Sequence, residues 1–206
     1  MKCDRSTCGA NRPLQGKLAG WIIAAGLLAL LPCLVCSHGS RLETFSFAVD
    51  SSAAGGHTVV TLIRNGDRPI VAKIAPDAGA NLFSLEFCGV PLLKSPQSLE
   101  GFDGSSLGVP VLYPTPCRVP EGRFTFQGRE FNFVRNRDGN HIHGLVRDAD
   151  WQWKVPVADS AGVRLVTWID FTPGDGRYEQ FGYDHRLELE YVVDRDGLGI
   201  EFRLTN

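Results

Sequence analysis

The chain has 206 residues, with 21 lysines and arginines against 23 aspartates and glutamates, and a net charge of −2 at pH 7. This length is enough for one domain with a substantial core. The charge is nearly balanced and no long run has a single sign, so the sequence lacks the electrostatic footprint of a nucleic-acid-binding protein. A neutral small molecule is the kind of partner that such a chain suits.

Residues 1–37 form a segment of their own. A basic start is followed by an apolar run over residues 18–35, which predicts a secretory signal peptide cleaved after Ser37. The run also reaches the lower limit of a membrane span, roughly 17 residues, so a retained hydrophobic helix acting as a membrane anchor is the second interpretation. Either way residues 38–206 are expected to be exported, as a secreted, periplasmic or anchored domain facing away from the cytoplasm. A buried helix is the third interpretation.

Six cysteines are present, and four of them lie in this first segment. Cys33 and Cys36 have the spacing of a redox or metal motif, but they sit in an apolar run without a second ligand pair, so no metal is expected there. The remaining two, Cys88 and Cys117, are interpreted as unpaired thiols. A bridge between them stays open, because an exported protein could form one and the sequence does not give their separation.

From residue 41 onward the sequence has the pattern of short strands separated by turns. Apolar and polar residues alternate or β-branched residues cluster, and Gly, Asp, Asn or Pro residues bound each run. Asn65-Gly66 is a hairpin signal between two runs. The strands expected before the middle of the chain are Thr44–Val49, His57–Arg64, Ile70–Ile74 and Leu82–Phe87.

The later runs are longer. Tyr183–Val193 alternates most clearly, with His185, Leu187, Leu189, Tyr191 and Val193 on one side. The other expected strands are Arg123–Gln127, Glu130–Val134, Trp151–Val155, Gly162–Asp170 and Leu198–Leu204. No helical period is evident after residue 40, so the predicted fold is all-β, an antiparallel β-sandwich preceded by the N-terminal hydrophobic helix. Trp153 and Trp168 are expected in its core, although tryptophan faces can also stack on sugar rings.

The densest set of polar groups lies between Gly108 and Trp151. Arg118 follows a proline-rich turn, and a hairpin then leads to His141-Ile142-His143-Gly144. A guanidinium holds paired hydroxyl oxygens, and an imidazole exchanges hydrogen bonds and protons near neutral pH. Taken alone, Arg118 could equally form a surface ion pair with Glu121 or Asp148. The two histidines would share one face of a strand, but no third ligand is near, so a metal is not expected.

This stretch resembles the aldose 1-epimerase, or galactose mutarotase, family. The resemblance weakens outside it but extends from about Val71 to Asn206. The positions that match the family pattern, in order, are Gly108, Pro110, Leu112, Tyr113, Pro114, Arg118, Gly122, Phe124, Gly128, Phe131, Asn136, Asn140, Ile142, His143 and Gly144.

The resemblance implies a galactose mutarotase-like sandwich that binds a sugar without metal or cofactor. Arg118 and His143 would bind the substrate, with His143 near the ring oxygen and both lining one concave site. His141 occupies an unspecified position of the pattern. The family usually has Asn before the arginine, whereas Cys117 stands here, which removes one amide that could bind a hydroxyl.

The family's catalytic acid is a second histidine in an H-P-Y-F-like segment, and its base is a glutamate near the C-terminus. The sequence ends at Asn206, where that segment should begin. We therefore expect residues 38–206 to be the N-terminal part of the sandwich, with the acid and base beyond Asn206. The predicted function is an isomerase that interconverts the α and β anomers of an aldohexose by acid–base ring opening, and this chain alone should be inactive. The alternative is a non-catalytic carbohydrate-binding sandwich.

Overall fold

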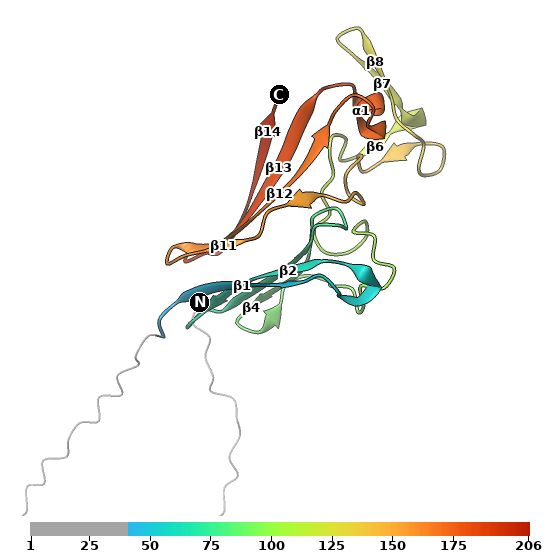
Figure 1. Ribbon diagram of the computed structural model, residues 1–206. Coiled ribbons are helices and arrows are strands. Elements are labelled where there is room, and N and C mark those ends of the chain that lie inside the picture. The colour runs from blue at the N-terminus through green and yellow to red at the C-terminus, as the bar shows by residue number, and fades with distance from the viewer. Residues whose placement is uncertain (1–40) are drawn as a thin grey trace, which may run out of the picture.

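A computed structural model describes residues 41–206, so the predicted leader lies outside the described residues. The described part is built almost entirely from antiparallel strands, in two five-stranded sheets and two small two-stranded ones (Figure 1). The first large sheet has the order β1-β2-β3-β4-β5. Its strands are β1 (Thr44–Asp50), β2 (Val59–Asn65), β3 (Ile70–Ala75), β4 (Asn81–Phe87) and β5 (Val90–Pro91), with a 3-10 turn, η1 (Ala54–Gly56), between β1 and β2.

The second large sheet has the order β10-β12-β13-β14, and β11 also pairs with β12. Its strands are β10 (Gln152–Trp153), β11 (Val157–Ala158), β12 (Gly162–Phe171), β13 (His185–Asp194) and β14 (Leu198–Thr205). Of the expected strand Trp151–Val155 only Gln152–Trp153 forms a strand, and β11, which follows that range, also pairs with β12. The long alternating runs of β12 and β13 pair along their full ten residues, because each presents one apolar side to the core.

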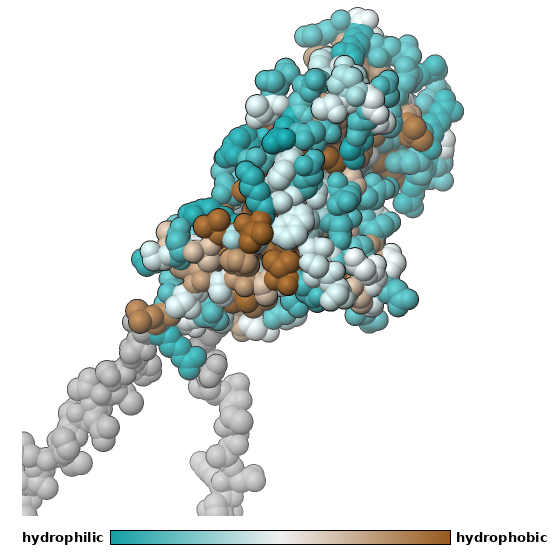
Figure 2. All heavy atoms as spheres, in the orientation of Figure 1, coloured by the Kyte–Doolittle hydropathy of each residue, from teal (hydrophilic) through white to brown (hydrophobic). Residues whose placement is uncertain are grey.

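The core fills the space between the two sheets. Its buried side chains alternate along β2, β3, β12 and β13, and Trp151 joins them from the chain before β10. Side-chain hydrogen bonds tie the sheets together: the Tyr191 hydroxyl donates to the Ala80 carbonyl, and the Arg64 guanidinium donates to the Asp194 and Arg195 carbonyls. On the face shown, hydrophobic residues gather along the line where the two sheets approach each other (Figure 2). The predicted antiparallel β-sandwich is therefore confirmed.

One helix departs from the expectation that no helix follows residue 40. α1 (Gly176–Phe181) lies between β12 and β13. Asp175 caps its start by accepting a hydrogen bond from the Arg177 amide, and Gly182 ends it in the left-handed conformation with φ of 68°. Six residues are too few to show a helical period, so only these two capping residues could have revealed it.

The expected position of one tryptophan is also wrong. Trp153 is partly buried and packs against the core, whereas Trp168 lies on the outer side of β12. Its ring lies beneath the cations of Lys154 and Arg186, 5.7 and 5.3 Å from the ring centroid. Alternation along β12 decides this, because Ile169 and Thr167 take the inward positions on either side of Trp168.

No helix within residues 41–206 is long and apolar enough to cross a membrane.

Candidate functional site

The polar stretch of the sequence folds at one end of the sandwich. It contains two short sheets and a 3-10 turn. These are β6 (Arg118–Val119) paired with β9 (His141–Ile142), β7 (Arg123–Phe126) paired with β8 (Arg129–Asn132), and η2 (Pro120–Gly122). The β7–β8 hairpin at Gly128 is confirmed.

Strand pairing brings the two predicted binding residues close together. Arg118 lies directly opposite Ile142, and His143 is the next residue along the chain. Directly opposite α-carbons are about 5 Å apart and successive ones 3.8 Å apart, so the α-carbons of Arg118 and His143 are within roughly 9 Å. Both side chains therefore start from the same small patch of backbone. That they line one concave sugar site stays a prediction.

The Arg118 side chain is available for a ligand. It is exposed, and within residues 41–206 it has no hydrogen-bond or ion-pair partner. Glu121, the surface partner considered above, binds Arg123 instead at 2.6 Å. The proline turn, residues 113–117, leads into Arg118 and forms with it a shallow hollow of about 340 Å³. Thr115 lines this hollow, and its Oγ1 is buried without a hydrogen-bond partner among the described residues.

His143 is held in an uncommon backbone conformation. Its φ is +65°, and Gly144 follows at +71°. A Cβ on Gly144 would lie 2.2 Å from the Tyr113 carbonyl oxygen, so only glycine fits there. The His143 Nδ1 lies 3.2 Å from the Pro116 carbonyl oxygen. Because a carbonyl only accepts, Nδ1 carries the proton, and the neutral ring keeps Nε2 as an acceptor for a hydroxyl.

The two histidines do not share a face as the sequence pattern suggested. Strand β9 ends at Ile142, so the alternation that would align them is broken at His143. His141 is buried, stacks on Phe133 with ring centroids 4.8 Å apart, and has its Nδ1 2.8 Å from the Val134 carbonyl oxygen. Within residues 41–206 no group of three His, Cys, Asp or Glu side chains could hold a metal ion.

The two asparagines of the sequence pattern shape the backbone here. The Asn136 side chain accepts from the Ile142 amide at 2.8 Å and donates to its carbonyl at 3.0 Å. The Asn140 side chain accepts from the Glu121 amide at 3.1 Å. These bonds hold the backbone that leads into His143. Cys117 is exposed and its thiol is free, so no bridge joins it to Cys88.

Sequence reasoning missed the group that supports the proline turn from below. The Tyr113 hydroxyl lies 2.9 Å from Nε2 of His185, a buried residue at the start of β13. The other ring nitrogen of His185, Nδ1, is 2.8 Å from the Tyr183 carbonyl oxygen. Because that carbonyl only accepts, Nδ1 donates to it, and Nε2 accepts from Tyr113. Burial raises the pKa of Tyr113. In the sequence His185 looked like any inward residue of a strand, so no local signal marked it.

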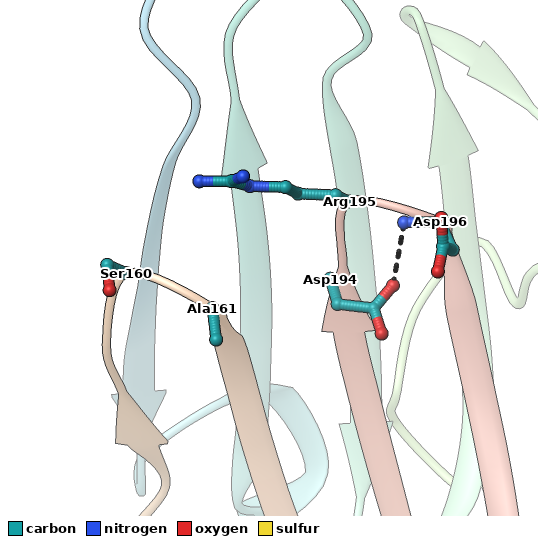
Figure 3. Close-up of a pocket in the computed structure, with 5 residues that line it drawn as sticks. All are labelled: Ser160, Ala161, Asp194, Arg195 and Asp196. Atoms are coloured by element: carbon teal, nitrogen blue, oxygen red, sulfur yellow. Dashed lines mark hydrogen bonds between the residues drawn. The ribbon is translucent and has the colours of Figure 1, made fainter.

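A second hollow of about 380 Å³ lies at the other end of the second sheet (Figure 3). It is lined by the β11–β12 turn and the β13–β14 turn, and the Asp194 carboxylate accepts from the Asp196 amide at 2.8 Å. The Arg195 side chain extends away from that carboxylate in Figure 3. The Asp194 carboxylate is bound by amides of its own turn, and Arg195 lies 3.8 Å from Glu43, so we do not consider this hollow the functional site.

The antiparallel sandwich is the fold of galactose mutarotase-like proteins. The comparison with known families agrees: the aldose 1-epimerase family model matches residues 62–206, and the chain belongs to this family.

Individual relatives resemble only part of their own length. The uncharacterized protein YihR of Escherichia coli K12 is 32% identical over 133 residues, which are 62% of this chain and 39% of YihR. A galactose mutarotase-like protein from Clostridium acetobutylicum superposes with a TM-score of 0.66 at 25% identity, covering 78% of this chain and 48% of that one. A galactose 1-epimerase from Lactobacillus acidophilus shares the fold, with a TM-score of 0.57 at 20% identity over 81% and 49% of the two chains. The chain thus spans about half the length of these relatives or less.

Proposed function

We propose that this chain carries the sugar-binding groups of an aldose 1-epimerase-like isomerase. Its reaction interconverts the α and β anomers of an aldohexose: a base removes the proton of the anomeric hydroxyl, an acid protonates the ring oxygen as its bond to C1 breaks, C1–C2 rotates, and the ring closes on the other face with the two protons returned. Family membership supports the mutarotase-like class. The observation that carries the proposal is the exposed Arg118 guanidinium, which has no partner within residues 41–206 and lies beside His143, whose turn is shaped by Gly144.

The two residues have complementary parts in holding the sugar. Arg118 donates from a planar fork onto neighbouring hydroxyl oxygens. His143, with Nδ1 bound to the Pro116 carbonyl, accepts from a hydroxyl through Nε2 when neutral and donates toward the ring oxygen when protonated. No metal or redox cofactor takes part in this scheme.

The acid and base are proposed to lie outside residues 41–206. The other described histidines are engaged: His57 with Asp77 at 3.0 Å, His141 with the Val134 carbonyl, and His185 with Tyr113. His143 is therefore the described histidine best placed for a ligand. This same observation favours the second candidate function, a carbohydrate-binding sandwich without catalysis, for the chain as printed.

Polarimetry and binding measurements separate these functions. The purified 206-residue chain is mixed with freshly dissolved α-glucose or α-galactose, and anomer interconversion is followed against buffer. Since a general acid or base contributes about 10²–10⁴-fold each, we expect no acceleration from this chain alone, but saturable sugar binding by NMR titration. Robust turnover would show that the chain already contains its acid and base. Absence of any sugar binding would contradict both functions.

Variants assign that binding to the proposed residues. Arg118→Lys keeps the charge but removes the planar fork, and His143→Gln removes the imidazole ring, so each should weaken sugar binding about tenfold. Arg123→Lys is the matched control, since Arg123 is an exposed arginine nearby that pairs with Glu121. Equal weakening by the control would remove the assignment to Arg118.

A further inference from the structure

His185 is the polar exception among the inward residues of β13, because the inward positions that follow it are leucine, tyrosine or valine. It is 5% exposed, pairs directly with Phe171 at the end of β12, and stacks on that ring with centroids 4.3 Å apart. Burying an imidazole in such a place costs free energy unless its nitrogens are hydrogen-bonded. Both are bonded: Nδ1 donates to the Tyr183 carbonyl at 2.8 Å, and Nε2 accepts from the Tyr113 hydroxyl at 2.9 Å.

The Tyr113 side chain fixes the proline turn to the second sheet. Its ring packs edge-on against Phe171, Phe181 and His185, with centroids 5.8, 6.0 and 5.6 Å away. These three rings come from the end of β12, the end of α1 and the start of β13. Among the described residues, the hydroxyl bonds to His185 and to no other group. The packing fills the space, and the hydrogen bond sets the direction of the side chain because such bonds are directional.

The backbone of Tyr113 in turn holds the turn that contains His143. The Tyr113 carbonyl oxygen accepts from the Leu145 amide at 2.7 Å. Gly144 lies against the same carbonyl, because a Cβ built on it would be 2.2 Å from that oxygen. The residues directly after His143 are thus fitted to the backbone of Tyr113, and a displacement of Tyr113 would displace them too.

The proline turn has few other means of holding its place. Two of its five residues, Pro114 and Pro116, have no amide to donate. The Pro116 carbonyl oxygen is the group that lies 3.2 Å from Nδ1 of His143, and the turn leads directly into Arg118. The position of Tyr113 therefore affects both candidate binding residues at once.

We propose that His185 is a positioning residue for the sugar site. Through its hydrogen bond to Tyr113 it holds the proline turn and the His143 turn where Arg118 and His143 can bind one sugar together. His185 is buried and does not line the hollow beside Arg118, so it acts through Tyr113 and not on the sugar. The role in sugar binding rests on the function proposed above.

Variants of the full 206-residue chain separate the hydrogen bond from the packing. Tyr113→Phe removes the hydroxyl and keeps the ring, His185→Leu keeps apolar volume without either nitrogen, and His185→Gln returns an acceptor oxygen near the place of Nε2. In NMR titrations with glucose or galactose, the first two should each weaken binding about tenfold, and His185→Gln should recover most of that loss. The double variant of Tyr113→Phe and His185→Leu should also lose about tenfold and not hundredfold, because both changes break one bond.

Leu189→Ala is the control for a loss of stability alone. It leaves a cavity deeper in the same strand, where Leu189 is 1% exposed, so it should lower the urea midpoint more than Tyr113→Phe does and leave sugar binding unchanged. Equal weakening of binding by Leu189→Ala would show that His185 matters only for stability. Normal binding by Tyr113→Phe and His185→Leu would likewise overturn the proposal.

Hydrogen exchange at the Leu145 amide tests the same coupling without sugar. Because this amide donates to the Tyr113 carbonyl, it should exchange about tenfold faster in Tyr113→Phe and in His185→Leu, and near the wild-type rate in His185→Gln. Unchanged exchange in the first two variants would overturn the proposal whatever the sugar result. A wild type that binds no sugar, with Leu145 responding as expected, would remove the proposed function and leave His185 as the residue that positions the His143 turn.

Discussion

Strands β13 and β14 are neighbours with the same alternation of apolar and charged residues, yet the apolar side of β13 is buried and that of β14 is largely exposed. On β13 the inward residues from Leu187 to Val193 are fully buried, because the first sheet lies across them. On β14 the residues directly paired with them become more exposed toward the C-terminal end. The comparison shows that alternation decides which way a side chain points, whereas burial depends on what lies opposite.

A matched pair of truncations tests this difference most directly and should have the largest effect. Leu189→Ala leaves a cavity in the closed core and should lower the free energy of unfolding by about 2–5 kcal/mol. Phe202→Ala removes a larger side chain from the position directly opposite, but the phenyl ring is mostly exposed, so the loss should be below about 1 kcal/mol. Urea unfolding at one fixed protein concentration measures both. Equal losses would mean that Phe202 is covered in solution.

Arg64 of the first sheet binds the turn between β13 and β14. Removing its guanidinium should have the next largest effect on the free energy of unfolding. Arg64 of β2 is 1% exposed and donates to the Arg68 carbonyl at 2.8 Å, the Asp194 carbonyl at 2.6 Å and the Arg195 carbonyl at 2.9 Å. Arg64→Met keeps a long side chain but leaves these carbonyls without their donor, which should cost about 3 kcal/mol.

Amide hydrogen exchange shows which part of the structure loses stability in Arg64→Met. Amides of the β13–β14 turn should exchange faster in Arg64→Met, while those around Tyr113 should keep their protection. Lys73→Met is the control, because Lys73 is a cation on neighbouring β3 that lies partly exposed. Unchanged exchange at the turn would show that Arg64 does not anchor it.

The candidate site rests on the start of β13, where the buried His185 binds the Tyr113 hydroxyl. Gly144 approaches the Tyr113 backbone, so Gly144→Ala should cost about 2 kcal/mol or more through strain and displacement of the turn. Gly128→Ala is the matched control: its φ is +77°, but nothing lies within 4 Å of its Cβ position, so only the conformational cost applies. Sugar binding should fall in the first variant and not in the second.

The smallest effect concerns pH. Burial raises the pKa of Tyr191 above its usual value of 10.0, because the apolar core disfavours the phenolate. The folded state keeps this proton where the unfolded state begins to release it. Stability from this group is therefore full below pH 10.0 and is lost as pH rises above that value.

Tyr191→Phe tests this contribution. At neutral pH the variant should lose about 1 kcal/mol, since the Ala80 carbonyl loses its donor. Above pH 10.0 its stability should decline less steeply than that of the wild type. Urea unfolding at neutral pH and across the alkaline range measures both trends. Parallel alkaline declines would contradict the assignment to Tyr191.

Much of the fold follows from local pattern. Strands β2, β3, β4, β12, β13 and β14 lie close to the predicted ranges, and Asn65-Gly66 does lie between paired strands. The short helix α1 is not predictable from periodicity because six residues show no period, and Trp168 lies outward because the alternation of β12 outweighs the size of its side chain. At the candidate site, Arg118 and His143 are predicted only by the family resemblance, because no physical property of either residue distinguishes it from other surface residues. Taken alone, Arg118 and His143 each fit an ordinary surface position equally well.

The sequence by itself determined the alternation of each strand and the turns between them, because these depend on neighbours within a few residues. Tertiary structure alone decided which apolar faces are covered, where the buried Arg64 finds its carbonyls, and that His185 lies beneath Tyr113. Arg64 and Asp194 are 130 residues apart along the chain, and Tyr113 and His185 are 72 residues apart. No local preference encodes such a meeting, since it exists only once two separate sheets have packed against each other.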